Sequence, residues 1–218
     1  MKILFIGNSY TYYNDMPKLF SLLAEENGQT VSVDSVTKGG RKLIENLDFE
    51  NDENSKKILE LSKENKYDVL FLQEQSLLPI KDIKKFQIGA DELTRLAMAK
   101  RNILYATWGR KSGCEVLTEM NLTSEEMTDK LYSAYESTAK SINAELSPVG
   151  LCFNHISQKH KNLELYAPDL SHPSYFGSAL AAACHYKTIF GKAPEKFESL
   201  SLASDAILAI CDALASIN

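Results

Sequence analysis

A serine near the start of the sequence and an acid–imidazole pair near its end have the residue types of a nucleophilic hydrolase. Ser9 ends the segment Gly7-Asn8-Ser9, which follows a short apolar run. A buried strand that ends in glycine and a hydroxyl residue can present a nucleophile or bind an anion. Asp169 and His172 are three residues apart, and a carboxylate can orient an imidazole so that it removes a proton from serine. These residues therefore suggest a hydrolase.

Each of these residues also has a structural interpretation. Ser9 can cap the segment that follows it or hold a turn. Asp169 or Ser171 can cap the next helix, and His172 can be a surface histidine. The hydrolase prediction therefore depends on all the residues together.

The other histidines and the cysteines predict no site. His155, His160 and His185 have no acidic residue at comparable spacing, and His185 lies in an apolar helix where it is expected to be packed. The cysteines are Cys114, Cys152, Cys184 and Cys211, with no Cys-x-x-Cys pair. This spacing is untypical of zinc ribbons and of thioredoxin-like sites, and it favours buried free thiols.

Two further segments could donate hydrogen bonds to a negative charge. Gly39 and Gly40 lie between Lys38 and Arg41, and glycine allows close approach to a ligand. Gln73 and Gln75 supply side-chain amides after another apolar run, and an amide aimed at an oxyanion is worth roughly 100–1,000-fold in turnover. A plain loop and amides bonded to the loop backbone are the structural alternatives.

Short apolar runs alternate with longer amphipathic stretches along the chain. The predicted strands span residues 2–7, 31–36, 67–73, 102–107 and 147–152. The predicted helices lie near residues 15–27, 53–66, 81–100, 123–145, 174–190 and 199–217. This alternation predicts a parallel sheet that is covered on both faces through right-handed crossovers.

Caps and strand ends refine this prediction. Gly28 is a predicted helix C-cap, Thr123 and Glu126 form a predicted capping box, and Pro173 suits the first turn of a helix. Ligands bind beyond the carboxyl ends of parallel strands. The residues expected to gather at that edge are Ser9, Gly39, Gly40, Gln73, Glu74, Gln75, Ser76, Trp108 and Asn154.

Length and composition restrict the class of protein. The chain has 218 residues, of which 44% are hydrophobic and 24% charged, which predicts a single globular domain over residues 1–218 that needs no metal or disulfide. A net charge of −5 without a basic cluster disfavours nucleic acid as a partner.

We predict a cytoplasmic protein, because no apolar stretch could span a bilayer and the first strand leaves no room for a signal peptide. Removal of a leader would give the same sequence.

The ordered segments resemble the SGNH (GDSL-like) hydrolase superfamily, whose blocks carry Ser, Gly, Asn and Asp-x-x-His. GNSYT matches the first block, KGG the second and DLSHP the last. Gly-Asn-Ser replaces the usual Gly-Asp-Ser, and Gln-Glu-Gln-Ser replaces Gly-x-Asn-Asp. The resemblance covers nearly the whole chain and implies a three-layer α/β/α sandwich with a parallel, flavodoxin-like five-stranded sheet. LQEQS, HPS and the following Gly-x-x-Leu-Ala-Ala resemble a less characterised branch that is often associated with carbohydrates.

The resemblance also implies roles for the matching residues. Ser9 would be the nucleophile, His172 would take and return its proton, and Asp169 would fix the imidazole tautomer. The Ser9 and Gly40 amides and the Gln75 side chain would hold the oxyanion. Gly39 remains an alternative to Gly40, and Gln73 to Gln75. No cofactor or metal is required.

Aromatic residues beside the nucleophile suggest the class of substrate. Tyr10, Tyr12 and Tyr13, with Trp108, could form an aromatic wall, although ordinary packing is the alternative. We expect a short-chain ester, with an O-acetyl group on a carbohydrate as the preferred candidate.

Asn8 makes the turn resemble a ligand loop, so a flavodoxin-like module that binds flavin or phosphate is the first alternative function. The second is a non-catalytic interaction domain.

Overall fold

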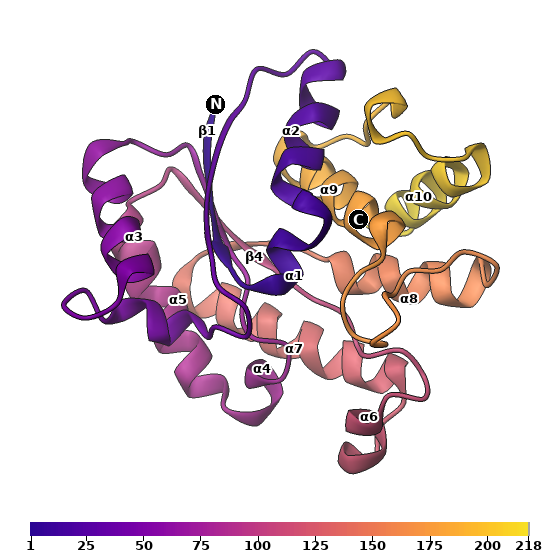
Figure 1. Ribbon diagram of the computed structural model, residues 1–218, viewed down its shortest axis with the longest axis horizontal. Coiled ribbons are helices and arrows are strands. Elements are labelled where there is room, and N and C mark those ends of the chain that lie inside the picture. The colour runs from indigo at the N-terminus through magenta and orange to yellow at the C-terminus, as the bar shows by residue number, and fades with distance from the viewer. Residues whose placement is uncertain (218) are drawn as a thin grey trace. The chain divides into compact units, whose positions relative to one another are not determined.

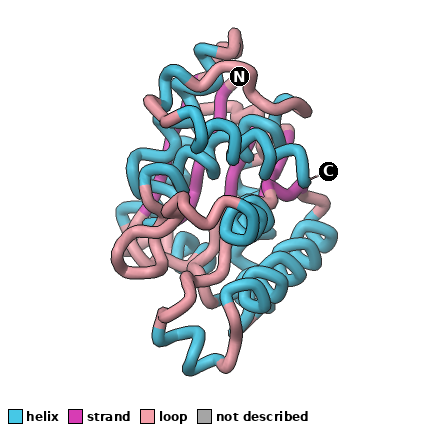
Figure 2. The backbone as a smooth tube through the Cα atoms, turned by 90° about the vertical axis from the view of Figure 1, so that its right-hand side faces the viewer, coloured by secondary structure: helices cyan, strands magenta, loops and turns pink. Residues whose placement is uncertain are grey.

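The sheet of the computed structural model, which describes residues 1–217, has five strands in the order β2-β1-β3-β4-β5 (Figure 1). β1 (Lys2–Gly7) pairs in parallel with β2 (Ser32–Thr37) and with β3 (Val69–Leu72). β3 pairs in parallel with β4 (Arg101–Tyr105). β5 (Glu145–Ser147) forms the edge of the sheet next to β4, and β2 forms the opposite edge. The strands run side by side in Figure 2.

The central strands are buried on both faces. Successive side chains of a strand point to opposite faces, and every residue of β3 and Ile3–Gly7 of β1 are buried. The register pairs Leu4 with Leu70 and Phe5 with Phe71, whose rings stack with centroids 4.6 Å apart. The strand order reverses at β1, and right-handed crossovers then place helices on both faces of the sheet. The fold is therefore a three-layer α/β/α sandwich, as predicted.

Residue contacts divide the chain into two compact units. The first comprises residues 1–12, 31–105 and 133–146, and the second comprises residues 13–30, 106–132 and those from Ser147 onward. The first unit contains α1 (Ser9–Tyr12), η2 (Leu43–Leu47), α3 (Glu53–Glu64), α4 (Leu78–Lys81) and α5 (Ile83–Ala97). α7 (Ser124–Ile142) contributes to both units.

The second unit is mainly helical. Its elements are η1 (Tyr13–Asp15), α2 (Met16–Glu26), α6 (Glu115–Met120), α8 (Val149–Lys159), α9 (Tyr175–Phe190), η3 (Glu198–Leu200) and α10 (Ser204–Ser216). α9 contacts α2, α8 and α10, and α8 also contacts α10 (Figure 1). α9 begins where the Ser174 hydroxyl accepts the Gly177 amide at 3.1 Å, and it ends at Gly191, whose φ is 72°.

One of the three predicted caps is confirmed as predicted. The C-cap of α2 is Asn27, so the prediction for Gly28, whose φ is 79°, is wrong by one position. Thr123 and Glu126 exchange the two bonds of a capping box, at 2.7 and 3.1 Å. The prediction for Pro173 is wrong by two positions, because Ser174 is the N-cap and α9 starts at Tyr175.

The predicted fifth strand at residues 147–152 is wrong. β5 ends at Ser147, and α8 begins at Val149, so Asn154 lies in a helix and does not follow a strand. The Gly150 amide donates to the Ala106 carbonyl at 3.0 Å, and a Cβ on Gly150 would come within 2.3 Å of the Thr107 carbonyl. A short apolar run fits a buried strand and a buried helix equally well. Within residues 1–217, no helix has the length and apolar character needed to cross a membrane.

Candidate active site

The turn that carries Ser9 joins β1 directly to α1. Ser9 is the first residue of α1 and is 9% exposed. The Asn8 side-chain oxygen accepts the Tyr10 amide at 3.2 Å, and the Asn8 carbonyl accepts the Thr11 amide at 2.9 Å. Asn8 therefore caps α1 and fixes the backbone on both sides of the serine.

Gln73 holds this turn from the end of β3. Its side-chain oxygen accepts the Asn8 amide and the Thr11 hydroxyl, each at 2.9 Å, and its amide donates to the Glu74 carbonyl. Gly7 allows this close packing, because a Cβ there would lie 2.4 Å from Thr11 Oγ1 and 2.8 Å from Gln73 Oε1. Gln73 is 1% exposed, and both its polar atoms have partners within the protein.

The glycine loop is a tight turn fastened to Asn8. The Arg41 amide donates to the Lys38 carbonyl at 3.1 Å, and Gly40 has φ of 68°, which favours glycine. The Asn8 side-chain amide donates to the Arg41 carbonyl at 2.9 Å. No residue within 1–217 accepts a hydrogen bond from the Gly39 or Gly40 amide. Both amides are therefore available to a ligand.

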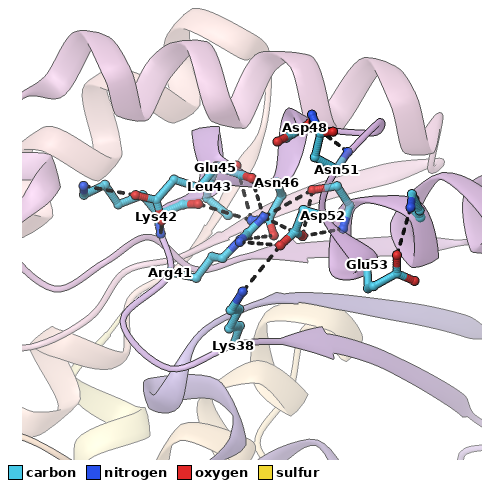
Figure 3. Close-up of polar contacts among 12 residues, drawn as sticks. Lys38, Arg41, Lys42, Leu43, Glu45, Asn46, Asp48, Asn51, Asp52 and Glu53 are labelled. Carbon is cyan, nitrogen blue, oxygen red and sulfur yellow. Dashed lines mark hydrogen bonds and ion pairs between the residues drawn. The ribbon is translucent and has the colours of Figure 1, made fainter.

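Arg41 anchors the glycine loop to the start of α3 (Figure 3). Its guanidinium makes two bonds to the Asp52 carboxylate, at 2.7 and 2.9 Å, and Nε donates to Asn46 Oδ1 at 3.0 Å. Asp52 also accepts the Ser55 amide at 2.9 Å as the N-cap of α3. The Ser55 amide, together with Arg41, holds the pKa of Asp52 well below its usual range. The carboxylate therefore stays charged and the loop stays anchored.

Glu74 is a buried carboxyl group that lies just after β3. It has no exposed surface, and it accepts the Leu43 amide at 3.1 Å and the Gln75 amide at 2.6 Å. Its own amide donates to the Tyr135 hydroxyl at 3.1 Å. Burial raises the pKa of Glu74 to about 8, against the opposing effect of the two backbone amides. Glu74 thus joins η2 to the segment after β3.

Gln75 differs from Gln73 in its free donor. The Gln75 side-chain oxygen accepts the Leu77 and Leu78 amides at 2.9 and 3.1 Å. No acceptor for Gln75 Nε2 lies among residues 1–217. Of the two glutamines, Gln75 has the side-chain amide that can donate to a ligand.

In the second unit, Asp169 and His172 lie on one turn. Asp169 Oδ2 contacts His172 Nδ1, and Oδ1 accepts the Ser171 and His172 amides at 3.0 and 2.9 Å. Burial raises the pKa of the Asp169 carboxyl, but the hydrogen bonds from His172 and Ser171 outweigh this effect and leave the pKa below its ordinary value. An ionised carboxylate therefore holds one imidazole nitrogen.

Tyr13 supports the imidazole from one face. The Tyr13 and His172 rings stack with centroids 4.3 Å apart and an interplanar angle of 12°. Asn14, with φ of 52°, donates to the Pro173 carbonyl at 3.2 Å and to the Ser178 hydroxyl at 2.9 Å. The Ser178 hydroxyl donates in turn to the Tyr13 carbonyl at 3.2 Å. These bonds fix η1 against the turn that carries His172.

The aromatic residues of the predicted wall differ in exposure. Trp108 is fully buried, stacks on Phe153 at 3.9 Å and donates from Nε1 to the Ser171 carbonyl at 3.1 Å. It therefore supports the turn of His172 from the interior. Tyr10 is 3% exposed, whereas Tyr12 is 43% exposed. Tyr12 is the one of these three with an open ring surface.

The remaining histidines are a buried residue, as predicted for His185, and a pair that shares an unpredicted acidic partner. His185 is buried as predicted, its Nδ1 lies 2.7 Å from the Ser147 hydroxyl, and burial lowers its pKa to about 3. His155 and His160 both contact Asp212. Local sequence spacing gives no sign of this contact, because Asp212 is more than fifty residues away along the chain.

The predicted site residues form one group in each unit. The group in the first unit consists of Asn8, Ser9, Tyr10, Gly39, Gly40, Gln73 and Gln75. The group in the second unit consists of Trp108, Asp169 and His172. Arg41, Glu74 and Asn14 also hold these groups in place, and their residue types alone do not indicate it.

Comparison with known proteins gives structural relatives only. No family model and no curated protein matches the sequence. A solved structure of a protein assigned to the SGNH hydrolases, from Slackia heliotrinireducens, is 28% identical with a TM-score of 0.75, and the alignment covers 87% of this chain and 98% of that one.

Two further solved structures are similar in fold. A DUF4886 family protein from Bacteroides uniformis is 16% identical with a TM-score of 0.79, over 99% of this chain and 95% of that one. An acetyl xylan esterase is 14% identical with a TM-score of 0.61, over 87% of this chain and 100% of that one. The structures at 16% and 14% identity show the fold alone, whereas the 28% identical structure, with the sequence blocks and the parallel sheet, supports the predicted assignment of this chain to the SGNH (GDSL-like) hydrolase superfamily.

Proposed function

We propose that this hydrolase is a serine esterase that cleaves short-chain esters, acetyl esters above all, through an acyl-enzyme on Ser9. The observation that carries the proposal is the Asp169–His172 turn. The carboxylate accepts two backbone amides and contacts His172 Nδ1, so the imidazole is held in one orientation. Nε2 is then the nitrogen that takes the serine proton.

The reaction proceeds in two halves. Ser9 Oγ attacks the ester carbonyl carbon while its proton passes to His172, and the tetrahedral intermediate then expels the alcohol, which receives that proton. Water attacks the acyl-enzyme in the second half, with His172 again as base. Asp169 stabilises the imidazolium in both halves.

The Ser9 and Gly40 amides and the Gln75 side-chain amide stabilise the oxyanion in this proposal, with Gly39 as the alternative to Gly40. The glycine amides without an acceptor support this assignment, as does the available Gln75 amide. Gln73 is a weaker candidate, because its oxygen holds the turn and its amide donates to the Glu74 carbonyl. Preorganised donors of this kind are worth roughly 100–1,000-fold each in turnover.

A short acyl group on a sugar or aryl alcohol is the proposed substrate class. A Cβ on Gly39 would lie 3.1 Å from the Tyr12 hydroxyl, so the exposed Tyr12 ring borders the glycine loop. Aromatic faces bind sugar rings and aryl groups. The similarity to an acetyl xylan esterase supports the same class.

Labelling with a fluorophosphonate probe, followed by peptide mapping, tests the nucleophile. We expect the probe on Ser9, and we expect Ser9→Ala to lose several decades of turnover on an aryl acetate. Acetylated xylosides and aryl esters of increasing chain length then define the acyl pocket. A folded, unlabelled protein would contradict the proposal, and a yellow one would support the flavin alternative.

A further inference from the structure

Two histidines and an aspartate lie close together at α8 and α10, which contact one another (Figure 1). His155 Nε2 lies 2.7 Å from Asp212 Oδ2, and His160 Nε2 lies 2.9 Å from the same oxygen. One ligand atom from each of the three residues lies within 4.8 Å of the others. Two imidazole nitrogens and a carboxylate oxygen therefore converge on one point.

The backbone around this point is fixed by packing. His155 precedes Ile156 on α8, and Asp212 precedes Ala213 on α10; both of these neighbours are fully buried. His160 is the C-cap of α8, and its amide donates to the Ile156 carbonyl at 2.8 Å. The three side chains thus project from rigid positions, as a preorganised site requires.

We propose that His155, His160 and Asp212 bind one Zn²⁺ ion, with water completing the coordination. Two imidazoles and a carboxylate suit zinc and similar transition metals, whereas Mg²⁺ and Ca²⁺ prefer oxygen ligands. Zinc–ligand bonds near 2.0 Å in a tetrahedron separate ligand atoms by about 3.3 Å. The present contacts of 2.7 and 2.9 Å reach this spacing through side-chain movements of under about 1 Å.

Charge and access agree with this assignment. The side chains are 21%, 28% and 52% exposed for His155, His160 and Asp212, which lets the ion and its water enter. The site also lies at the carboxyl end of α8, where the helix dipole favours a cation.

Bound zinc would connect α10 to α8 in the second unit. Because the three ligands meet only in the folded chain, binding would stabilise the native state. None of the three is a residue of the proposed esterase mechanism, so this site does not depend on that proposal.

Calorimetric titration and thermal unfolding of the chelator-treated full chain test the proposal. In the titration we expect one Zn²⁺ to bind per chain and Mg²⁺ to give no binding heat. At a free Zn²⁺ concentration about a hundred times Kd, Tm should rise by roughly 5–10 °C. Asp212→Asn and His160→Gln should each weaken zinc affinity by at least about 100-fold. Circular dichroism without metal shows whether each variant is folded.

Two control variants test other side chains that could bind zinc. His172→Gln removes the other His–Asp pair, and Cys211→Ser removes the exposed thiol beside Asp212. Both should bind zinc as the unmodified chain does. Zinc affinity that is unchanged in Asp212→Asn and in His160→Gln, or lost in either control, would overturn the proposal.

Discussion

The Tyr13 ring lies parallel to the His172 imidazole, with 4.3 Å between the ring centroids. Asp169 holds the same imidazole at Nδ1. The Asp169 carboxylate therefore fixes one edge of the His172 ring, and the Tyr13 ring packs on one of its faces. Tyr13 is itself fixed through Asn14, which bonds to Pro173 and Ser178.

Removal of the Tyr13 ring should impair the base without removing it. An aromatic stack is worth about 0.5–1.5 kcal/mol, so Tyr13→Ala should lower kcat/KM on an aryl acetate by roughly 2- to 12-fold. Tyr13→Phe keeps the ring and should restore the rate. A pH–rate profile that is shifted in Tyr13→Ala alone would identify a positioning role, whereas equal rates for all three proteins would contradict it.

Asp169→Asn should remove the charge that orients His172 while keeping the side-chain size. The asparagine keeps an oxygen that can accept the Ser171 and His172 amides, so we expect a folded protein whose turnover falls by roughly 10⁴-fold. Asp205→Asn, on the exposed start of α10, is the matched control and should keep full activity. Comparable activity in the two variants would remove Asp169 from the mechanism.

Gln73 and Gln75 should respond in opposite ways to substitution. Gln73→Ala leaves the buried Asn8 amide and Thr11 hydroxyl without an acceptor, which should lower the free energy of unfolding by roughly 2–5 kcal/mol. Gln75→Glu keeps the acceptor for Leu77 and Leu78 but removes the amide donor. It should lower turnover by roughly 100-fold or more with little change in stability.

Urea unfolding and steady-state rates of both variants separate these effects. If Gln73 were the oxyanion donor, Gln73→Ala would lose turnover in its folded fraction, and Gln75→Glu would not.

Glu74 should make stability depend on pH. Its pKa is about 8 in the folded chain against an ordinary 4.5, so the folded state holds a proton that the unfolded state has already released. This contribution is fully present below about pH 4.5 and is lost as the pH rises through about 8. The free energy of unfolding should therefore be lower at about pH 9 than at about pH 5, by roughly a few kcal/mol.

Glu74→Gln is the control for this pH dependence, because it cannot ionise and keeps an acceptor for the Leu43 amide. Urea unfolding at several pH values should show a shallower fall in this variant. Parallel curves for the two proteins would mean that another group is responsible.

Most of the sheet was predictable because β1 and β3 are continuous apolar runs bounded by polar residues. Their observed ends lie within two residues of the predictions. The error at residues 147–152 arose because α8 also starts with an apolar run, and because its start depends on packing of Gly150 against Ala106 and Thr107. Such long-range packing leaves no local periodicity to read.

The site was predictable only where its partners are close in sequence. Asp169 and His172 are three residues apart, and their contact followed from that spacing. The contacts from Gln73 to Asn8 and from Asp212 to His155 join segments more than fifty residues apart. A single sequence contains no signal for those pairs, because the fold alone brings them together.

Gly7 has a consequence for how this sequence can vary. Even a methyl group there would displace Thr11 or Gln73, both of which already hold the neighbouring backbone. In a saturation library selected for folded protein, position 7 should retain glycine alone. Gly40, whose missing methyl faces open space, should accept at least asparagine.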